Sequence, residues 1–354
     1  MKAKTITLFI ILSVCHFLNG ETALKAQACR DTLSVMIIGD VMMHQAQLEK
    51  DYTQFLKHIS KDLRSADIAV ANMEFSLGGE PYSGYPRFSA PDSYAGYVAT
   101  ECGVDVFLTA NNHILDRGQK GLKRTLSVYE GMKEKVLFTG SAGSKEELEQ
   151  NYPVIIDRKG IKLAIINFTY GTNGIHAEGW PNTNYMVKES IDSAFIRAAK
   201  QNADFIAVLP HWGTEYELHH NSTQEIWAGY LVGRGADVIV GGHPHVVQDS
   251  THINGVPVFY SIGNAVSNMS AENTRLELAV TLRFVNDHIS GIRTMLEPEI
   301  RYMWCCLPGR LNDNFSTIFV KEWLGHRSEW INPSDYDNMV NTYQRVRQET
   351  GVSD

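Results

Sequence analysis

From residue 33 onward, short apolar runs alternate along the chain with longer amphipathic stretches. Short β-branched runs predict buried strands, whereas amphipathic stretches predict helices that cover them. The strand-like runs lie at 33–40, 67–74, 105–113, 135–140, 161–168, 204–213, 237–245 and 257–264. The helix-like stretches include 53–65, 118–132, 190–201 and 223–233. This alternation predicts an α/β fold.

Two longer apolar segments, 152–168 and 276–300, are each interrupted by polar turn residues and predict antiparallel hairpins. The sheets are therefore expected to be mixed. Residues 333–349 predict a helix that closes the fold. Because the chain has no repeat, long linker or low-complexity segment, we expect a single domain from residue 29 to residue 354.

The first 28 residues predict an export signal. Two lysines precede an apolar stretch at 6–18, and a small-residue pattern follows at 26–28. The stretch is short for a membrane span, and no later segment reaches the ~20 apolar residues that a spanning helix needs. We therefore expect an exported protein, in the periplasm or at the cell surface. A lipid anchor at Cys15 stays open, because the preceding residues loosely resemble a lipoprotein cleavage box.

Charge and cysteine content narrow the class of protein. The formal net charge of -8 argues against a general nucleic-acid binder, which needs a basic face. The remaining cysteines are Cys102, Cys305, Cys306 and, depending on cleavage, Cys29. They show no CxxC spacing, so we expect buried thiols, with disulfides in an oxidising compartment as the alternative.

Side chains suited to metal binding follow one strand-like run after another. Each of them alone has an ordinary explanation, such as a turn residue, an exposed acid or a structural histidine. Parallel or mixed sheets, however, bring strand ends together at one edge, so the recurrence predicts one shared site. The runs end in "GDVMMH" (40 and 44), "ANMEFS" (74), "ANNHILDRG" (111–116), "VLPHWGTEY" (211–215) and "VIVGGHPHVVQ" (243 and 245).

The last of these motifs predicts two imidazoles held in place. Gly241 and Gly242 let the backbone turn sharply and come close to a neighbour, and Pro244 stiffens the loop. The rings of His243 and His245 would then keep a fixed separation, which suits a metal ion.

The whole set combines carboxylate, amide and imidazole groups and predicts one or two divalent ions such as Mn, Fe, Zn or Ni. A carboxylate able to bridge suggests two neighbouring ions, an arrangement that activates water beside a phosphoryl oxygen. The expected ligands are Asp40, Glu74, Asn112, His211, His243 and His245, with His44 as an additional candidate. Asp116 follows His113 at a distance from which it could orient that imidazole, and the expected substrate contacts are Asn111, Trp212 and Glu215.

Together with "FYSIGN", these motifs resemble the ordered motif series of the CapA family over residues 33–285. That family comprises poly-γ-glutamate capsule synthesis proteins of the calcineurin-like metallophosphoesterase superfamily. The resemblance implies a four-layer αββα sandwich of two mixed sheets with the site at the sheet edge. It also implies Asp40, Glu74 and Asn112 as ligands beside the histidines, and His113 as the group that protonates the leaving group.

The chain departs from the superfamily pattern at the first strand. General phosphoesterases carry Asp-x-His there, whereas this chain has Met42 at the third position. Two explanations stay open. Either His44 completes a second metal position, or the site holds one ion firmly and a second one loosely.

The expected function is that of an exported, metal-dependent hydrolase of phosphoesterase type acting on an anionic small molecule or polymer. One alternative is a non-catalytic factor that binds or exports an anionic polymer beside a membrane-associated capsule synthesis machinery. Another is a metal-dependent amidase that cuts γ-glutamyl polymer. Nucleic acid is not expected as a partner.

Overall fold

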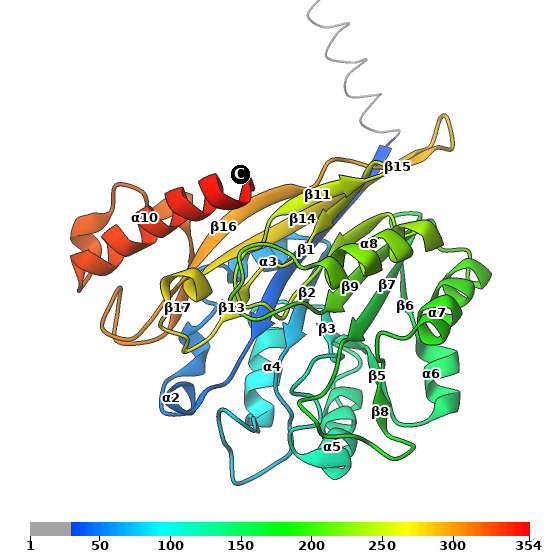
Figure 1. Cartoon of the computed structure of the whole chain (residues 1–354), viewed down its shortest axis with the longest axis horizontal. Helices are drawn as coiled ribbons and strands as arrows, with labels where there is room; N and C mark the ends of the chain where they lie inside the picture. Colours follow the sequence, from blue (N-terminus) through cyan, green and yellow to red (C-terminus); the bar gives the residue numbers. More distant parts are fainter. Residues whose placement is uncertain (1–29) are drawn as a thin grey trace, which may run out of the picture.

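The computed structural model describes residues 30–354, whose strands form two large mixed sheets (Figure 1). The first sheet contains, in spatial order, β17 (Ser316–Phe319), β16 (Glu299–Cys306), β14 (Leu276–Asp287), β1 (Arg30–Val41), β2 (Ile68–Met73), β3 (Val106–Leu108) and β4 (Leu137–Thr139). Beside this row, β13 (Asn264–Val266) pairs with β1 and β15 (Arg293–Met295) pairs with β14.

The second sheet has the order β11 (Ser250–Ile253), β12 (Val256–Phe259), β10 (Val238–Val240), β9 (Phe205–His211), β7 (Ile161–Thr169) and β6 (Val154–Arg158). Its central strands run parallel, and its outer pairs are antiparallel. Both predicted hairpins are confirmed, as β6 with β7 and β14 with β15. A small extra sheet joins β5 (Ser141–Ala142) to β8 (Asn182–Thr183).

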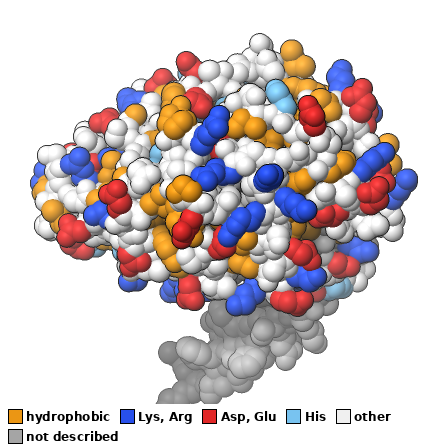
Figure 2. Space-filling model, turned by 90° about the horizontal axis from the view of Figure 1, so that it is seen from below, with side chains coloured by type: hydrophobic (Ala, Val, Ile, Leu, Met, Phe, Trp, Pro, Cys, Tyr) orange, Lys and Arg blue, Asp and Glu red, His pale blue; other side chains and the backbone are white. Residues whose placement is uncertain are grey.

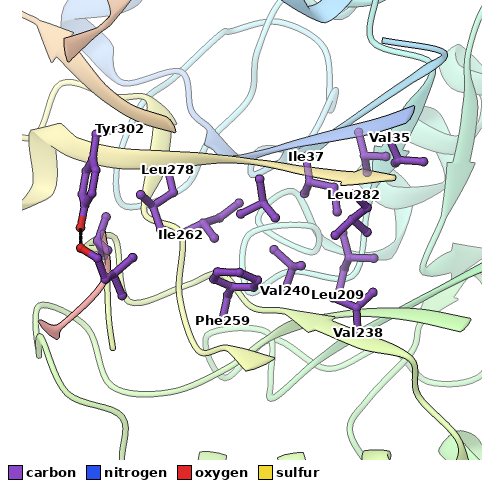
Figure 3. Packing of buried hydrophobic residues seen from close by; sticks show 14 of the residues in the cluster. Val35, Ile37, Leu209, Val238, Val240, Phe259, Ile262, Leu278, Leu282 and Tyr302 are labelled. Atoms are coloured by element: carbon purple, nitrogen blue, oxygen red, sulfur yellow. Dashed lines mark hydrogen bonds between the residues drawn. The ribbon is translucent and has the colours of Figure 1, made fainter. Parts of the chain in front are cut away.

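The two large sheets pack face to face around an apolar core. This core contains Val35 and Ile37 of β1, Leu209 of β9, Val240 of β10 and Leu278 of β14 (Figure 3). The opposite faces of the sheets are also buried, because helices cover them. Burial on both faces explains why the strands read as nearly continuous apolar runs.

Helices form the two outer layers. On the first sheet lie α3 (Ser60–Ser65), α4 (Asp92–Thr100) and α5 (Gly118–Glu130), and on the second lie α6 (Lys145–Asn151), α7 (Lys188–Lys200) and α8 (Ser222–Arg234). The predicted helices 118–132, 190–201 and 223–233 are thus confirmed as α5, α7 and α8. The result is the four-layer αββα sandwich that the resemblance implied.

The predicted closing helix is confirmed as α10 (Pro333–Thr350), which lies beside β16 (Figure 1). Its residues Met339 and Val346 join the core between the sheets. The hydroxyl of Tyr302 on β16 donates to the carbonyl of Val352 at 3.0 Å. The C-terminal helix therefore covers an end of the first sheet.

The predicted helix over 53–65 is wrong in its first half. A short 3₁₀ turn, Tyr52–Gln54, precedes α3, and residues 55–59 form turns instead of a helix. The carbonyl of Phe55 accepts a hydrogen bond from the backbone N–H of Thr317 on β17 at 2.8 Å. In a continuous helix, the carbonyl of Phe55 would instead accept the N–H of the residue four positions later. The hydrogen bond from Thr317 replaces that helical bond.

Three of the predicted buried thiols are confirmed, since Cys102, Cys305 and Cys306 are free and buried. Burial raises the pKa of the Cys305 thiol to about 12. In the described part of the chain, every helix is too short or too polar to cross a membrane. The predicted export signal at 1–28, with Cys15, and the cysteine at position 29 lie outside the described residues.

Glu277 on β14 gives a prediction about stability. Its carboxylate is fully buried, and within residues 30–354 neither oxygen has a hydrogen-bond partner. Burial, and then the charge of Asp40, raise the pKa of Glu277 well above its usual 4.5. The pKa of Glu277 is therefore higher in the folded protein than in the unfolded chain. The folded protein is most stable while Glu277 is protonated, and this stability is lost as the pH rises above 4.5.

Glu277→Met should therefore increase the free energy of unfolding by about 1–3 kcal/mol at pH 8, and by much less at pH 5. Urea unfolding at both pH values measures the difference. Glu272→Met, at an exposed glutamate of the same segment, is the matched control. An equal change at both pH values would show that the buried charge is not responsible.

Candidate metal centre

Asp40 reaches the site through a bulge at the end of β1. The register between β1 and β2 shifts at residues 38–40, so one extra residue is inserted beside Asn72. Gly39 allows this, because a Cβ there would collide with the carbonyl of Gly263. The carboxylate of Asp40 is fully buried and accepts a hydrogen bond from Nδ2 of Asn72 at 2.7 Å.

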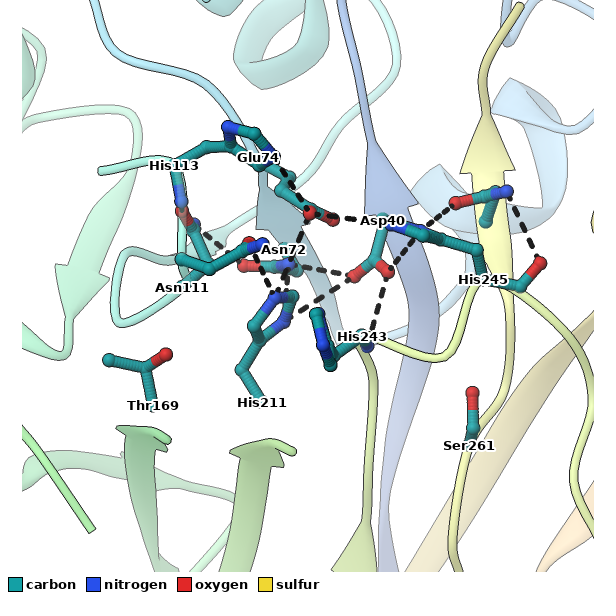
Figure 4. A network of polar contacts seen from close by, with 12 residues as sticks. Asp40, Asn72, Glu74, Asn111, His113, Thr169, His211, His243, His245 and Ser261 are labelled. Atoms are coloured by element: carbon teal, nitrogen blue, oxygen red, sulfur yellow. Dashed lines mark hydrogen bonds and ion pairs between the residues drawn. The ribbon is translucent and has the colours of Figure 1, made fainter. Parts of the chain in front are cut away.

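Glu74 lies at the middle of the cluster. Its carboxylate is fully buried, and in the described part of the chain nothing donates a hydrogen bond to either oxygen. Nε2 of His211, His245 and His113 lies 3.7, 3.8 and 4.0 Å from its Oε1 (Figure 4). These distances are too long for hydrogen bonds. For His211 and His245, the distances fit a cation between each imidazole and Glu74, since two atoms each ~2.1 Å from a metal are at most ~4.2 Å apart.

The loop after β3 supplies the amide and the candidate general acid. Oδ1 of Asn112 lies 3.0 Å from Nε2 of His211, so both atoms face the same position. Nδ1 of His113 lies 2.7 Å from Oδ2 of Asp116, which also accepts the N–H of Phe88 at 2.7 Å. Asp116 thus stands where it orients the imidazole and leaves Nε2 of His113 turned toward Glu74.

The loop after β10 brings in His243 and His245. Without a side chain, Gly241 lets the backbone pass close to the carbonyl of Tyr260, and a Cβ on Gly242 would lie 3.1 Å from Oδ1 of Asp40. Both histidines adopt left-handed backbone angles, with φ of 96° and 58°. Such a backbone is strained for residues other than glycine, and strain of this kind gathers at functional sites.

Two groups of potential ligands meet at Glu74. One group joins Glu74 to His243 and His245, and the other joins it to Asp40 and His211, with ligand atoms within 4.8 Å of one another in each group. Glu74 is therefore shared between two neighbouring positions for a cation. This is the place that the sequence predicted for a bridging carboxylate.

The protonation of these groups fits a divalent cation. Burial lowers the pKa of His211 to about 3 and also lowers that of His243, so both imidazoles stay neutral and able to bind a metal. Burial alone would raise the pKa of Asp40, but its hydrogen bond with His245 and the proximity of His211 hold it well below 3.8. Burial and the charge of Asp40 raise the pKa of Glu74 well above 4.5. The protein's own side chains thus leave Glu74 without a compensating positive charge.

Other predicted site residues lie outside the ligand groups. His44 belongs to neither group among the described residues; its Nδ1 lies 3.1 Å from Oε1 of Gln47, and burial lowers its pKa to about 4. Glu215 is half-buried, and its charge contributes to the raised pKa of Glu74, which places it near the centre.

Two predicted substrate contacts are structural instead. Trp212 is 2% exposed, and its indole N–H donates to the carbonyl of Tyr260 at 2.8 Å, so it packs in the core behind the site. Asn111 is buried, and its amide donates to the carbonyl of Met73 at 2.9 Å while its oxygen accepts the N–H of His113. Packing and loop support, not exposure to a ligand, explain both residues.

Several contributors were not among the predicted residues. Asn72 links Asp40, Asn111 and His211, and the alternation along β2 places it on the same face as Glu74 two residues later. Asn264 ends the quoted "FYSIGN" motif and contacts His245. The ring of Tyr170 lies 4.5 Å from that of His243, a contact between separate loops that carries no local sequence signal.

Asn264 gives a prediction about metal affinity. Its Oδ1 lies 2.8 Å from Nδ1 of His245, and its Nδ2 donates to the carbonyl of Thr274 at 2.9 Å. This pair fixes the imidazole so that Nε2 faces Glu74. Removing such support typically reduces metal affinity by about 10- to 100-fold. We expect that loss in Asn264→Ala, measured by competition with a chelating dye, and none in Asn151→Ala at an exposed control position.

The four-layer αββα sandwich, with acid, amide and imidazole groups gathered at the ends of its strands, is the arrangement that the family resemblance implied. The family comparison then confirms that resemblance. Residues 34–269 match the family of bacterial capsule synthesis proteins PGA_cap, and the chain belongs to that family.

Named relatives agree with this placement. The capsule biosynthesis protein CapA of Bacillus anthracis is 30% identical over 260 residues, which is 69% of this chain and 62% of that protein. The PGA biosynthesis protein CapA of Bacillus subtilis (strain 168) is 27% identical over 271 residues, covering 73% of this chain and 69% of that protein. The chain thus spans less than two thirds of the length of the first relative.

Solved structures show a weaker likeness. The NAD nucleotidase NadN of Haemophilus influenzae aligns with a TM-score of 0.48 and 16% identity over 78% of this chain and 58% of that one. A novel phosphatase from Mycoplasma pneumoniae aligns with a TM-score of 0.44 and 12% identity over 77% of this chain and 93% of that one. Likenesses of this size do not bear on the activity.

Proposed function

We propose that this protein is an exported, metal-dependent hydrolase of phosphoesterase type that acts on an anionic substrate. One observation carries the proposal: the buried carboxylate of Glu74, which lacks a hydrogen-bond partner among residues 30–354, is shared by two groups of ligands. A fixed His113–Asp116 pair stands beside it. Export rests on the sequence of residues 1–28.

The ligand set defines the proposed cofactor as one or two divalent ions, of Mn, Fe, Zn or Ni type. When bound, such ions activate a water molecule and offset charge on phosphoryl oxygens. The residues that would hold them are Asp40, Glu74, Asn112, His211, His243 and His245.

His113 is the proposed proton donor. Asp116 holds Nδ1 of its ring, so Nε2 is the atom that can deliver a proton to a departing alkoxide. The ring of Phe88 packs against that of His113 with centroids 4.6 Å apart and keeps water from one side of it. The position of the imidazole is therefore set by packing and by a buried hydrogen bond together.

The family also supports a second candidate function. The relatives are named for capsule or PGA biosynthesis, so a non-catalytic factor that binds or exports an anionic polymer is the alternative. A membrane-associated synthesis machinery would be its partner. Bound cations pair with carboxylates as readily as with phosphates, which makes this role compatible with the same centre.

Metal analysis and turnover assays of the purified protein test the proposal. The protein is loaded with Mn, Fe, Zn or Ni and assayed on a phosphomonoester, a phosphodiester and γ-glutamyl polymer. Metal-dependent release of phosphate or alcohol is the expected result. Cleavage of the polymer alone would identify an amidase, and tightly bound metal without turnover on any substrate would identify the binding role.

A further inference from the structure

A surface hollow is lined in part by Asp116, the hydrogen-bond partner of the candidate general acid His113. It has a volume of about 530 Å³ and is lined by Arg87, Asp116, Arg117, Gly118 and Ile175. Asp116 connects it to the centre, because the same carboxylate holds Nδ1 of His113. The hollow therefore lies on the side of the centre from which His113 acts.

Arg117 is held in this hollow by the shape of its surroundings. Its aliphatic stem passes so close to Gly78 and Gly121 that a Cβ on either glycine would collide with it. Its Nη1 donates to the carbonyl of Pro81 at 3.0 Å and to Oγ of Ser83 at 3.3 Å. Among the described carboxylates, none lies within 4 Å of its guanidinium, so the charge is positioned without an ion pair.

Arg87 adds a second cation to the same hollow. It is exposed, and no carboxylate of residues 30–354 forms an ion pair with it. The next residue, Phe88, packs on His113 and donates its N–H to Asp116, which ties this loop to the catalytic pair. Both residues line the hollow, and their guanidinium groups match the geometry of carboxylate and phosphate, so an anion there would offset two like charges.

Positive side chains are not spread evenly over the surface of this acidic protein. The chain carries a formal net charge of -8, yet a group of Lys and Arg side chains occupies the middle of the face shown in Figure 2. A local positive field on an acidic protein attracts anions to that face.

Asp116 lies between the hollow and the candidate metal centre. Its Oδ1 is buried and, within the described chain, has no hydrogen-bond partner, whereas Oδ2 is engaged by His113 and Phe88. Asp116 is 3% exposed and lines the hollow. Because the Asp116 carboxylate is buried, the accessible charges of the hollow are those of Arg87 and Arg117.

We propose that Arg87 and Arg117 form an oxyanion-binding subsite beside His113, which takes a second carboxylate or phosphate group of the substrate. The subsite itself stands on the hollow and its two cations, whereas its role in turnover rests on the proposed function. A group held there lies on the side of the departing alcohol. The substrate class is therefore dianionic or polyanionic, not a simple ester of a neutral alcohol.

Binding to the metal-depleted protein tests the subsite without turnover. Isothermal titration at low ionic strength uses tri-γ-glutamate as the carboxylate probe and tripolyphosphate as the phosphate probe. The variants are Arg87→Gln, Arg117→Gln and the pair together, with Lys200→Gln as a control of equal charge change on α7. Arg117→Lys keeps the packed stem and separates loss of the guanidinium from loss of packing.

We expect each glutamine variant to weaken binding of at least one probe roughly 10-fold, and Lys200→Gln to leave it unchanged. Loss for only one probe assigns the subsite to that chemistry. Unchanged affinity of the double variant for both probes overturns the proposal, as does failure of the unmodified protein to bind either. Because Arg87 is exposed, its variant keeps the fold, and a result is obtained even if the protein hydrolyses no ester.

Discussion

Glu74→Gln should remove most of the metal from this protein while making the metal-depleted form more stable. The carboxylate belongs to both ligand groups, so its loss affects both cation positions together. Loss of a direct ligand is expected to weaken binding by more than about 100-fold, which exceeds the usual effect of a supporting residue. Metal content after dialysis, measured by mass spectrometry, gives the first readout.

The effect on stability should have the opposite sign without metal. In the metal-depleted protein, Glu74 is a buried carboxylate whose oxygens lack partners in the described chain, and an amide at the same position carries no charge. We expect the variant to gain about 1–3 kcal/mol in that state. With metal at 100 times its dissociation constant, the unmodified protein should gain about 2.7 kcal/mol, and the variant much less.

Thermal unfolding with and without metal separates the two effects. Glu217→Gln, at an exposed glutamate in the loop that follows His211, is the matched control and should behave like the unmodified protein. Equal metal content in Glu74→Gln and the control would contradict the assignment of the shared ligand. A destabilised metal-depleted variant would contradict the account of the buried charge.

His113→Ala should reduce turnover by about 10²- to 10⁴-fold without removing the metal. His113 belongs to neither of the ligand groups found among the described residues. Its proposed role is proton donation through Nε2. The loss should be larger for an alkyl phosphate than for a nitrophenyl phosphate, because a nitrophenolate departs without needing a proton.

Two further variants serve as comparisons for the rate of His113→Ala. Asp116→Asn keeps the imidazole but weakens the hydrogen bond that orients it, so kcat should fall by less than in His113→Ala, with KM little changed. His219→Ala removes an exposed histidine of the same region and should leave the rate unaltered. An unchanged rate in His113→Ala, with metal retained, would remove His113 from the catalytic role.

The strands and the polar residues at their ends could be predicted because both signals are local. An apolar run buried on both faces is visible in the sequence, and so is the point at which Asp40 or His211 ends it. The prediction of a helix over 53–65 was wrong in its first half because the carbonyl of Phe55 accepts a hydrogen bond from a distant residue, Thr317. Amphipathic periodicity carries no information about such a bond.

Within the site too, contacts between residues distant in the chain could not be predicted from the sequence. Trp212 was expected to contact the substrate, yet its side chain is buried and packs in the core. Asn264 was part of a recognised motif, but its contact with His245 depends on β13 lying beside β1. The bulge at Gly39 likewise depends on the approach of Gly263 from another strand.

By itself, the sequence determined the fold class, the acid, amide and imidazole groups at the strand ends and the family resemblance, because these depend on residue type and local order. Only the tertiary structure decided that Glu74 is common to both ligand groups, that Asn72 and Asn264 contact the candidate ligands, and that Arg87 and Arg117 line one hollow with Asp116. The reason is strand order. Residues distant in the chain become neighbours when β1 lies between β13 and β2 and the two sheets face each other, and residue type does not encode that order locally.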